Sequence, residues 1–91
     1  MSKMTPAAIR NALVSVPGWR KKGQSIVCRR EFKNFVAAIK FVNAVARRAE
    51  KAQHHPDIDI RWNLVQLALT THDSGGLSDR DFELARAIDR L

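Results

Sequence analysis

The feature that most constrains the fold is a change in the spacing of apolar residues at Pro56. Before it, apolar side chains recur at helical spacing over 35–52, directly after an Asn34 that can cap a helix. After it, apolar and polar residues alternate, as is typical of strands with one buried face. The sequence therefore predicts a long helix and then a hairpin that turns near Asn63. The alternating apolar residues are Ile58, Ile60, Trp62, Val65, Leu67 and Leu69.

A short helix is expected near the start of the chain. Thr5 followed by Pro6 is typical of a helix start, because threonine caps the first turn and proline lacks an N–H that would be unused there. The pair Pro17-Gly18 stops this helix. Its apolar stripe consists of Ile9, Leu13 and Val16.

Residues 19–32 indicate a first hairpin with a short first strand. A basic stretch, 20–24, is expected to form the turn through Gly23. Trp19 precedes it and is either an anchor of the core or one wall of a pocket for a flat ligand. The β-compatible residues that follow are Ile26, Val27, Cys28 and Phe32.

The C-terminal segment predicts a last helix. The strand that reaches 70–72 is broken by Gly75-Gly76. Ser78 and Asp81 have the spacing of a capping box, in which the carboxylate reaches back to the Ser78 backbone N–H. The apolar face expected on this helix consists of Phe82, Ala85, Ile88 and Leu91.

Together the elements follow the order α-β-β-α-β-β-α. We predict an α+β fold in a single domain, residues 1–91, with a four-stranded antiparallel sheet and helices packed on one of its faces. A chain of 91 residues with 45% hydrophobic residues can build one core and leaves no room for a second domain.

Charge is unevenly distributed along the chain. The formal net charge is +7, with 12 Lys/Arg against 2 Asp/Glu in 1–53 and 4 against 7 in 54–91. A basic half can attract nucleic acid, acidic proteins or anionic small molecules. It can equally be a solvated helix face, in which Arg47, Arg48 and Lys51 complement the dipole at a helix end. With few aromatic residues beside the charges, tight nucleic-acid binding is not expected.

Location and assembly can also be predicted. Cys28 is the only cysteine, which excludes an internal disulfide and fits a reducing cytoplasm. No secretion signal opens the chain, and the most apolar run, 35–46, is too short to span a bilayer. The long helix carries more apolar surface than one sheet face needs, with Phe41 and Val45 in excess, so we expect a cytoplasmic homodimer or homotetramer.

All three histidines lie in one short segment of the chain. His54 and His55 precede the second hairpin and His72 follows it, so strand pairing brings both ends to one edge of the sheet. Imidazole titrates near pH ~6.5, so the cluster can supply an acid and a base at neutral pH. A metal site is less favoured, because adjacent histidines on a strand point to opposite faces and no cysteine completes a zinc set.

These residues resemble the signature of the pterin-4a-carbinolamine dehydratases. That pattern begins with a charged residue, three further residues and His-His-Pro. An aromatic residue follows after five more positions, a histidine after nine and an aspartate after eight. The sequence meets the pattern in full. A second block, Thr-His-Asp-x-Gly-Gly-Leu-Ser at 71–78, also matches, and the likeness covers most of the chain. The matching residues are Glu50, His54, His55, Pro56, Trp62, His72 and Asp81.

The resemblance implies a reaction and a setting. Members of the family remove water from 4a-hydroxytetrahydrobiopterin to give quinonoid dihydropterin, in the recycling of tetrahydrobiopterin for aromatic amino-acid hydroxylases. We therefore expect a pterin substrate, a functional link to such a hydroxylase, and neither a metal nor a redox cofactor. The family fold is a four-stranded antiparallel sheet with helices on one side, assembled into dimers or tetramers.

The resemblance also implies the roles of individual residues. His54 and His72 would form the main acid/base pair, and His55 would position the pterin or assist proton transfer. Asp81 would orient a histidine or contact the ring, and Glu50 would bind at the pocket edge or hold the surroundings of His54. The remaining substrate-binding residues would be Pro56, Trp19, Thr70 and Thr71.

The alternative to an enzyme is a non-catalytic protein-binding module. Some relatives act as dimerisation cofactors of a homeodomain transcription factor, and others with decayed sites assist assembly of ribulose bisphosphate carboxylase. A non-catalytic binding module of either kind would not need three histidines together with Asp81. Their joint presence favours an enzyme.

Overall fold

Both hairpins of the computed structural model join into one sheet. The structure describes residues 3–91. Every strand pair is antiparallel and the strand order is β1-β2-β4-β3, which confirms the predicted α+β class and element order. Within 3–91, no helix combines the length and hydropathy needed to cross a membrane. The elements are α1 (Pro6–Leu13), β1 (Arg20–Lys22), β2 (Ser25–Glu31), α2 (Phe35–Ala52), β3 (Asp57–Arg61), β4 (Leu64–Leu69), the 3-10 turn η1 (His72–Ser74) and α3 (Asp79–Asp89).

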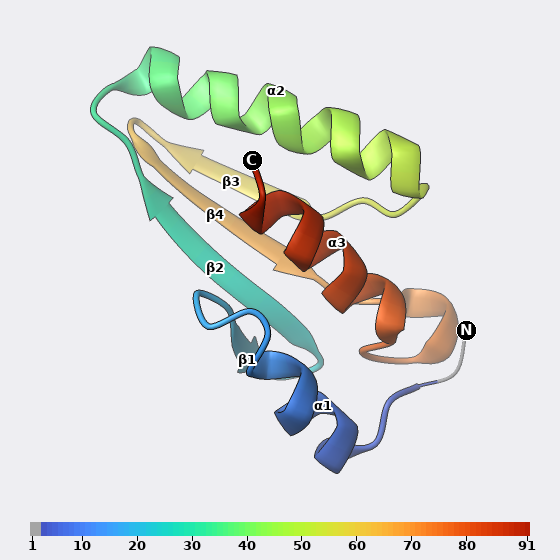
Figure 1. The fold of residues 1–91 in the computed structure, drawn as a ribbon. Coiled ribbons are helices and arrows are strands. Elements are labelled where there is room, and N and C mark those ends of the chain that lie inside the picture. Colours follow the sequence, from blue (N-terminus) through green and yellow to red (C-terminus); the bar gives the residue numbers. More distant parts are fainter. Residues whose placement is uncertain (1–2) are drawn as a thin grey trace.

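Helices α2 and α3 lie side by side across one face of the sheet (Figure 1). Beyond α3 lies α1, and Arg86 Nη1 of α3 donates to Ser15 Oγ at 3.1 Å just after the end of α1. Alternation in β4 places one row of side chains in the core between sheet and helices. The fully buried residues of this core include Val16, Ile26, Val45, Val65, Leu67, Leu69, Phe82 and Ile88.

Local sequence signals set the helix ends. The side chains of Thr5 and Asn34 cap α1 and α2, as predicted. At its other end α2 stops at Gln53, which has the left-handed backbone φ 54°, ψ 41°. This reversal brings the His54 backbone N–H to the Ala49 carbonyl at 3.1 Å. The cap therefore directs the chain out of α2 and straight into the histidine pair.

Three predicted boundaries in the first and last helices and the first hairpin are wrong. Helix α1 ends at Leu13, so Val16 lies in the following loop, although it is fully buried. The basic stretch contributes Arg20–Lys22 to β1, because a tight turn at Gly23, with φ 60°, is sufficient to reverse the chain. Leu91 lies beyond the end of α3 and is half exposed.

Strand β3 is less buried than its alternation predicts. It is an edge strand, and Ile58 remains exposed. Trp62 does not belong to the strand; it has φ 53° in the turn between β3 and β4 and is 70% exposed. The alternation describes burial well for β4, because that strand has neighbours on both sides and helices over one face.

The two residues predicted to be in excess on the long helix both pack within the chain itself, Val45 in the core and the partly buried Phe41 against it. Val45 is fully buried, and Phe41 packs against Phe32 with ring centroids 5.0 Å apart. The large apolar side chains that α2 exposes are Phe35 and Val36, at its start. A homodimer or homotetramer remains a prediction, and the fully buried Val45 is not available as a contact residue on its surface.

Candidate active site

The three histidines meet around one hollow of about 280 Å³. The hollow lies where the end of α2, the segment after β4 and the first turn of α3 come together. The expectation that the hairpin brings both of its ends to one edge is therefore correct for this fold. The residues that line it are Gln53, His54, His55, Thr70, Thr71, His72, Asp73 and Arg80.

A buried carboxylate fixes one of these histidines. Asp81 Oδ1 lies 2.6 Å from His54 Nε2, while Oδ2 accepts hydrogen bonds from the Thr71 hydroxyl at 2.8 Å and the Ser78 backbone N–H at 2.9 Å. Asp81 is fully buried and His54 is 8% exposed. Because both carboxylate oxygens are occupied, the imidazole is held in one orientation. With Nε2 bound, Nδ1 is the His54 nitrogen left to exchange a proton with a ligand.

The network behind Asp81 continues through a second hydroxyl. The Thr71 hydroxyl has one proton and donates it to Asp81, so Ser78, whose Oγ lies 2.8 Å away, donates to Thr71. Ser78 is also the N-cap of α3, and the predicted capping box is present. Asp81 thus serves two predicted roles at once, since it caps the helix and orients a histidine.

His55 and Glu50 form a second pair at the rim of the hollow. Their Nε2 and Oε2 atoms also lie 2.6 Å apart, but the two side chains are 60% and 74% exposed. Water competes for both groups, and exposed pairs of this kind contribute only about 0–1 kcal/mol. The structure therefore places Glu50 against His55 and not beside His54.

His72 is held by its loop and not by a carboxylate. Strand β4 ends at Leu69, earlier than predicted, and His72 is the first residue of the 3-10 turn. Two backbone hydrogen bonds between Thr71 and Gly76, of 3.3 and 3.2 Å, close the loop that carries it. The His72 side chain is exposed, and within residues 3–91 no carboxylate oxygen lies within 4.0 Å of its ring nitrogens.

Trp19 and Pro56 do not line the hollow. Trp19 is 4% exposed in the core, where its Nε1 donates to Asp89 Oδ1 at 2.9 Å. The structure therefore favours the interpretation of Trp19 as a core anchor. It does not place Trp19 beside the histidines, where a substrate-binding residue was predicted. Pro56 is half-buried and leads from His55 into β3.

Sequence reasoning missed Arg80, which lines the hollow. Its Nη2 donates to the carbonyl of Gln53, the cap of α2. Arg80 occupies the first turn of α3, between Asp79 and Asp81, where the helix dipole favours negative charge. A cation at a position where helices favour negative charge was the sequence signal that could have marked Arg80 as a candidate site residue.

The hollow contains groups suited to proton transfer. Three imidazoles face it, one with a buried carboxylate partner, one with an exposed partner and one without. An imidazolium can donate a proton and a neutral imidazole can accept one near neutral pH. In the part of the chain from 3 to 91, no three His, Cys, Asp or Glu side chains gather in a way that could hold a metal ion.

Comparison with known proteins agrees with the resemblance found in the sequence. A family model described as pterin 4 alpha carbinolamine dehydratase matches residues 2–91. A protein of Acidobacterium capsulatum that carries this family name is 55% identical over 91 residues, covering 100% of this chain and 99% of the relative. One of Thermomicrobium roseum is 48% identical over 91 residues, with 100% and 98% coverage. The chain belongs to the pterin-4-alpha-carbinolamine dehydratase family.

Two solved structures share the fold. The crystal structure of a transcriptional coactivator/pterin dehydratase from Brucella melitensis is 31% identical, covers 98% of this chain and 97% of its own, and has a TM-score of 0.93. A pterin dehydratase-like protein identified as a RuBisCO assembly factor in the alpha-carboxysome has a TM-score of 0.70 at 22% identity, with 80% and 87% coverage. The second likeness concerns the fold alone.

Proposed function

We propose that this protein dehydrates pterin-4a-carbinolamine, converting 4a-hydroxytetrahydrobiopterin into quinonoid dihydropterin and water in the cytoplasm. The observation that carries the proposal is the hollow around which three imidazoles gather, one of them fixed by the buried Asp81. Family membership supplies the substrate class. The product would be reduced again in tetrahydrobiopterin recycling for an aromatic amino-acid hydroxylase.

The reaction needs one acid and one base. The C4a–O bond breaks, its electron pair leaves with the oxygen, and an imidazolium protonates that oxygen so that water departs. A ring N–H gives its proton to a neutral imidazole, and the N–H electron pair forms the new C=N bond. Atoms and electrons balance without an oxidant, and the two imidazoles end with their protonation states exchanged.

We assign the acid/base pair to His54 and His72. The buried pair with Asp81 supports His54, because its Nδ1 is held at a fixed place and Asp81 can stabilise the imidazolium that forms. The exposed His72 lines the same hollow from the loop after β4, which supports it as the second member of the pair. His55 positions the pterin at the rim together with Glu50, and the backbone of 70–72 lines the flat ring.

Generation of the carbinolamine in the presence of the protein tests this function. A hydroxylase and its tetrahydropterin cofactor supply 4a-hydroxytetrahydropterin, whose ultraviolet absorbance decays as water is lost. We expect wild-type protein to accelerate the decay and His54→Ala/His72→Ala to return it to the background rate with the fold intact. Background decay with folded wild-type protein would contradict the proposal.

Such a failure would favour the alternative, a non-catalytic protein-binding module. The name of the Brucella melitensis relative, which joins a transcriptional coactivator with a pterin dehydratase, is the observation on that side. Capture of a protein partner that is unaffected by the double histidine variant would distinguish a binding module from an enzyme.

A further inference from the structure

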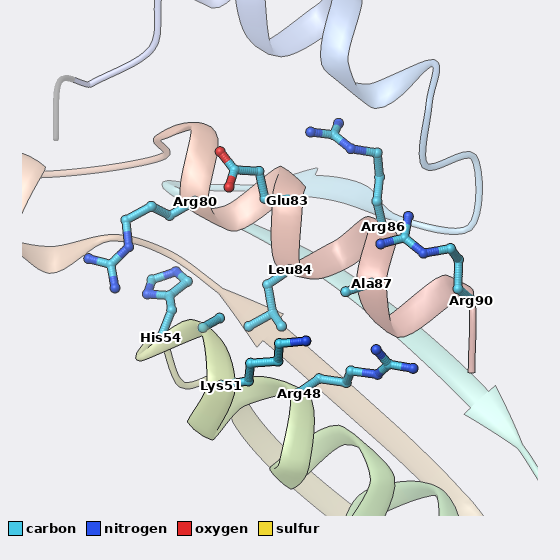
Figure 2. A pocket seen from close by; sticks show the side chains of 10 residues that line it. Arg48, Lys51, His54, Arg80, Glu83, Leu84, Arg86, Ala87 and Arg90 are labelled. Atoms are coloured by element: carbon cyan, nitrogen blue, oxygen red, sulfur yellow. The ribbon is translucent and has the colours of Figure 1, made fainter.

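A larger groove adjoins the histidine hollow. It has a volume of about 540 Å³ and lies between α2 and α3, as Figure 2 shows from close by. Two residues, His54 and Arg80, line both cavities, so the groove begins beside the histidine hollow. The charged side chains that line it are Arg48 and Lys51 from α2, with Arg80, Glu83, Arg86 and Arg90 from α3 and its end.

Positive charge dominates this groove. Five cationic side chains line it against the single carboxylate of Glu83. Within the described residues, none of the five has a carboxylate oxygen within 4.0 Å, since the ion pairs found there belong to Arg30, His54, His55 and Arg61. Like charges gathered in a concave surface concentrate positive potential and attract anions.

The cations of the groove come from two helices and from both ends of one of them. Lys51 lies in the last turn of α2 and Arg86 in the last turn of α3, where positive charge is favourable. Arg80 lies in the first turn of α3, where positive charge is not favourable, but its Nη2 donates to the Gln53 carbonyl at the C-terminal end of α2, where it is. Cations from two helices, and from opposite ends of one of them, therefore face the same groove.

The groove has a length and a floor suited to an extended ligand arm. Arg80 and Arg90 are ten residues apart on α3, which at 1.5 Å per residue corresponds to about 15 Å. Figure 2 places Arg80 and His54 toward one end, with Arg48 and Arg90 toward the other. Between them Leu84, a buried side chain, supplies an apolar floor.

We propose that this groove binds the phosphorylated side chain of a pterin whose ring occupies the histidine hollow. The proposal rests on the proposed function and extends it to the substrate class. Guanidinium groups bind phosphate oxygens in pairs, so the arginines provide geometry as well as charge. The uncharged side chain of a biopterin would leave these five cations without an anionic partner, whereas a side chain with several phosphates would supply one.

Binding calorimetry with three probes tests the proposal. The probes are 7,8-dihydroneopterin, its 3′-triphosphate and inorganic tripolyphosphate. The groove variant is Arg48→Glu/Arg90→Glu, and its control is Lys22→Glu/Lys40→Glu, which changes the charge equally at exposed positions outside the groove. Arg48→Gln/Arg90→Gln provides a milder groove variant if the double reversal unfolds the protein.

We expect the triphosphate to bind wild-type protein at least tenfold more tightly than dihydroneopterin. The groove variants should remove that advantage, raised salt should weaken it, and the control should keep it. Equal Kd values for the two pterins would overturn the proposal. So would an equal loss in the groove variant and the control, because the groove would then add only general charge, as on a surface for an acidic macromolecule.

A further outcome separates this proposal from the proposed function. Groove-dependent binding of tripolyphosphate by a protein that binds neither pterin would overturn the link between groove and pterin, and the proposed function with it. Tight binding of dihydroneopterin without any gain from its phosphates would instead overturn the groove proposal alone.

Discussion

The site contains two histidine–carboxylate pairs with the same separation and different surroundings. In both, Nε2 and a carboxylate oxygen are 2.6 Å apart. The His54–Asp81 side chains are 9% and 0% exposed, whereas those of His55 and Glu50 are 60% and 74% exposed. Distance alone would rank the pairs as equal. Burial ranks them differently, because water can replace the partner of an exposed group and cannot reach Asp81.

Hydrogen bonding strengthens the contrast. The second oxygen of Asp81 has two further donors, from Thr71 and Ser78, so the carboxylate belongs to a network that joins three segments of the chain. Glu50, in contrast, contacts a residue only five positions further along the chain, across the reversal at the end of α2. The first pair can therefore fix the orientation of its imidazole, while the second can only bias the orientation of an exposed one.

The largest effect expected from this contrast is on catalysis. His54→Ala should lower the dehydration rate by roughly 10²–10⁴-fold, the usual contribution of a positioned acid or base. His55→Ala should lower it by about tenfold or less, because an exposed pair contributes no more than about 1 kcal/mol. Carbinolamine decay measures both rates. Equal losses in the two folded variants would break the comparison.

The second largest effect is on stability, where the two carboxylates should contribute differently. Asp81→Asn leaves the buried network with a mismatched donor and should lower the free energy of unfolding by about 3–5 kcal/mol, the scale for breaking a buried pair. Glu50→Gln should change it by about 1 kcal/mol at most. Urea unfolding followed by circular dichroism measures the difference. Asp79→Asn, at an exposed position in the same helical turn, serves as the control.

Thr71 tests whether the network, and not the ion pair alone, carries the stability. Thr71→Val removes a donor to Asp81 and leaves the Ser78 hydroxyl without its acceptor, so a loss of about 1–3 kcal/mol is expected. Thr70→Val removes a hydrogen bond to the Gln24 carbonyl at an exposed position and should cost less. An equal cost in the two variants, again by urea unfolding, would show that the network adds nothing.

The smallest effect concerns Cys28, a buried thiol whose surroundings include Arg30 and Asp89. Burial raises the pKa of this thiol from 9.0 to about 11. The folded state therefore holds the proton more tightly, so its contribution is complete below pH 9 and is lost as the pH rises through 11. Between pH 8 and 10 the free energy of unfolding should fall by about 1 kcal/mol more than in Cys28→Ala. Parallel pH profiles would contradict this.

Much of the fold follows from signals that act over a few residues. The caps at Thr5, Asn34 and Ser78 were predicted because each side chain reaches backbone N–H groups within three residues. The role of Asp81 at the site follows from its match to a family signature. The alternation of apolar residues in β3 could not reveal that this strand lies at the edge of the sheet, because the periodicity of a strand does not specify its neighbours.

The basic groove could not be predicted from the distribution of charge along the chain. The second segment, 54–91, is acidic on average, yet three of its four Lys/Arg residues line the groove. They meet Arg48 and Lys51 only because α2 and α3 lie side by side. A charge average over sequence positions says nothing about such a cluster, which depends on tertiary packing.

The two tryptophans give the protein two optical probes in opposite environments. Trp19 is 4% exposed and its indole N–H is held by Asp89, whereas Trp62 is 70% exposed in the turn between β3 and β4. Fluorescence of Trp19 should be blue-shifted and protected from acrylamide, and that of Trp62 should be red-shifted and quenched. Trp62→Phe would thus leave a label-free probe of the core, while any molecule that covers the β3–β4 turn should alter the emission of Trp62 alone.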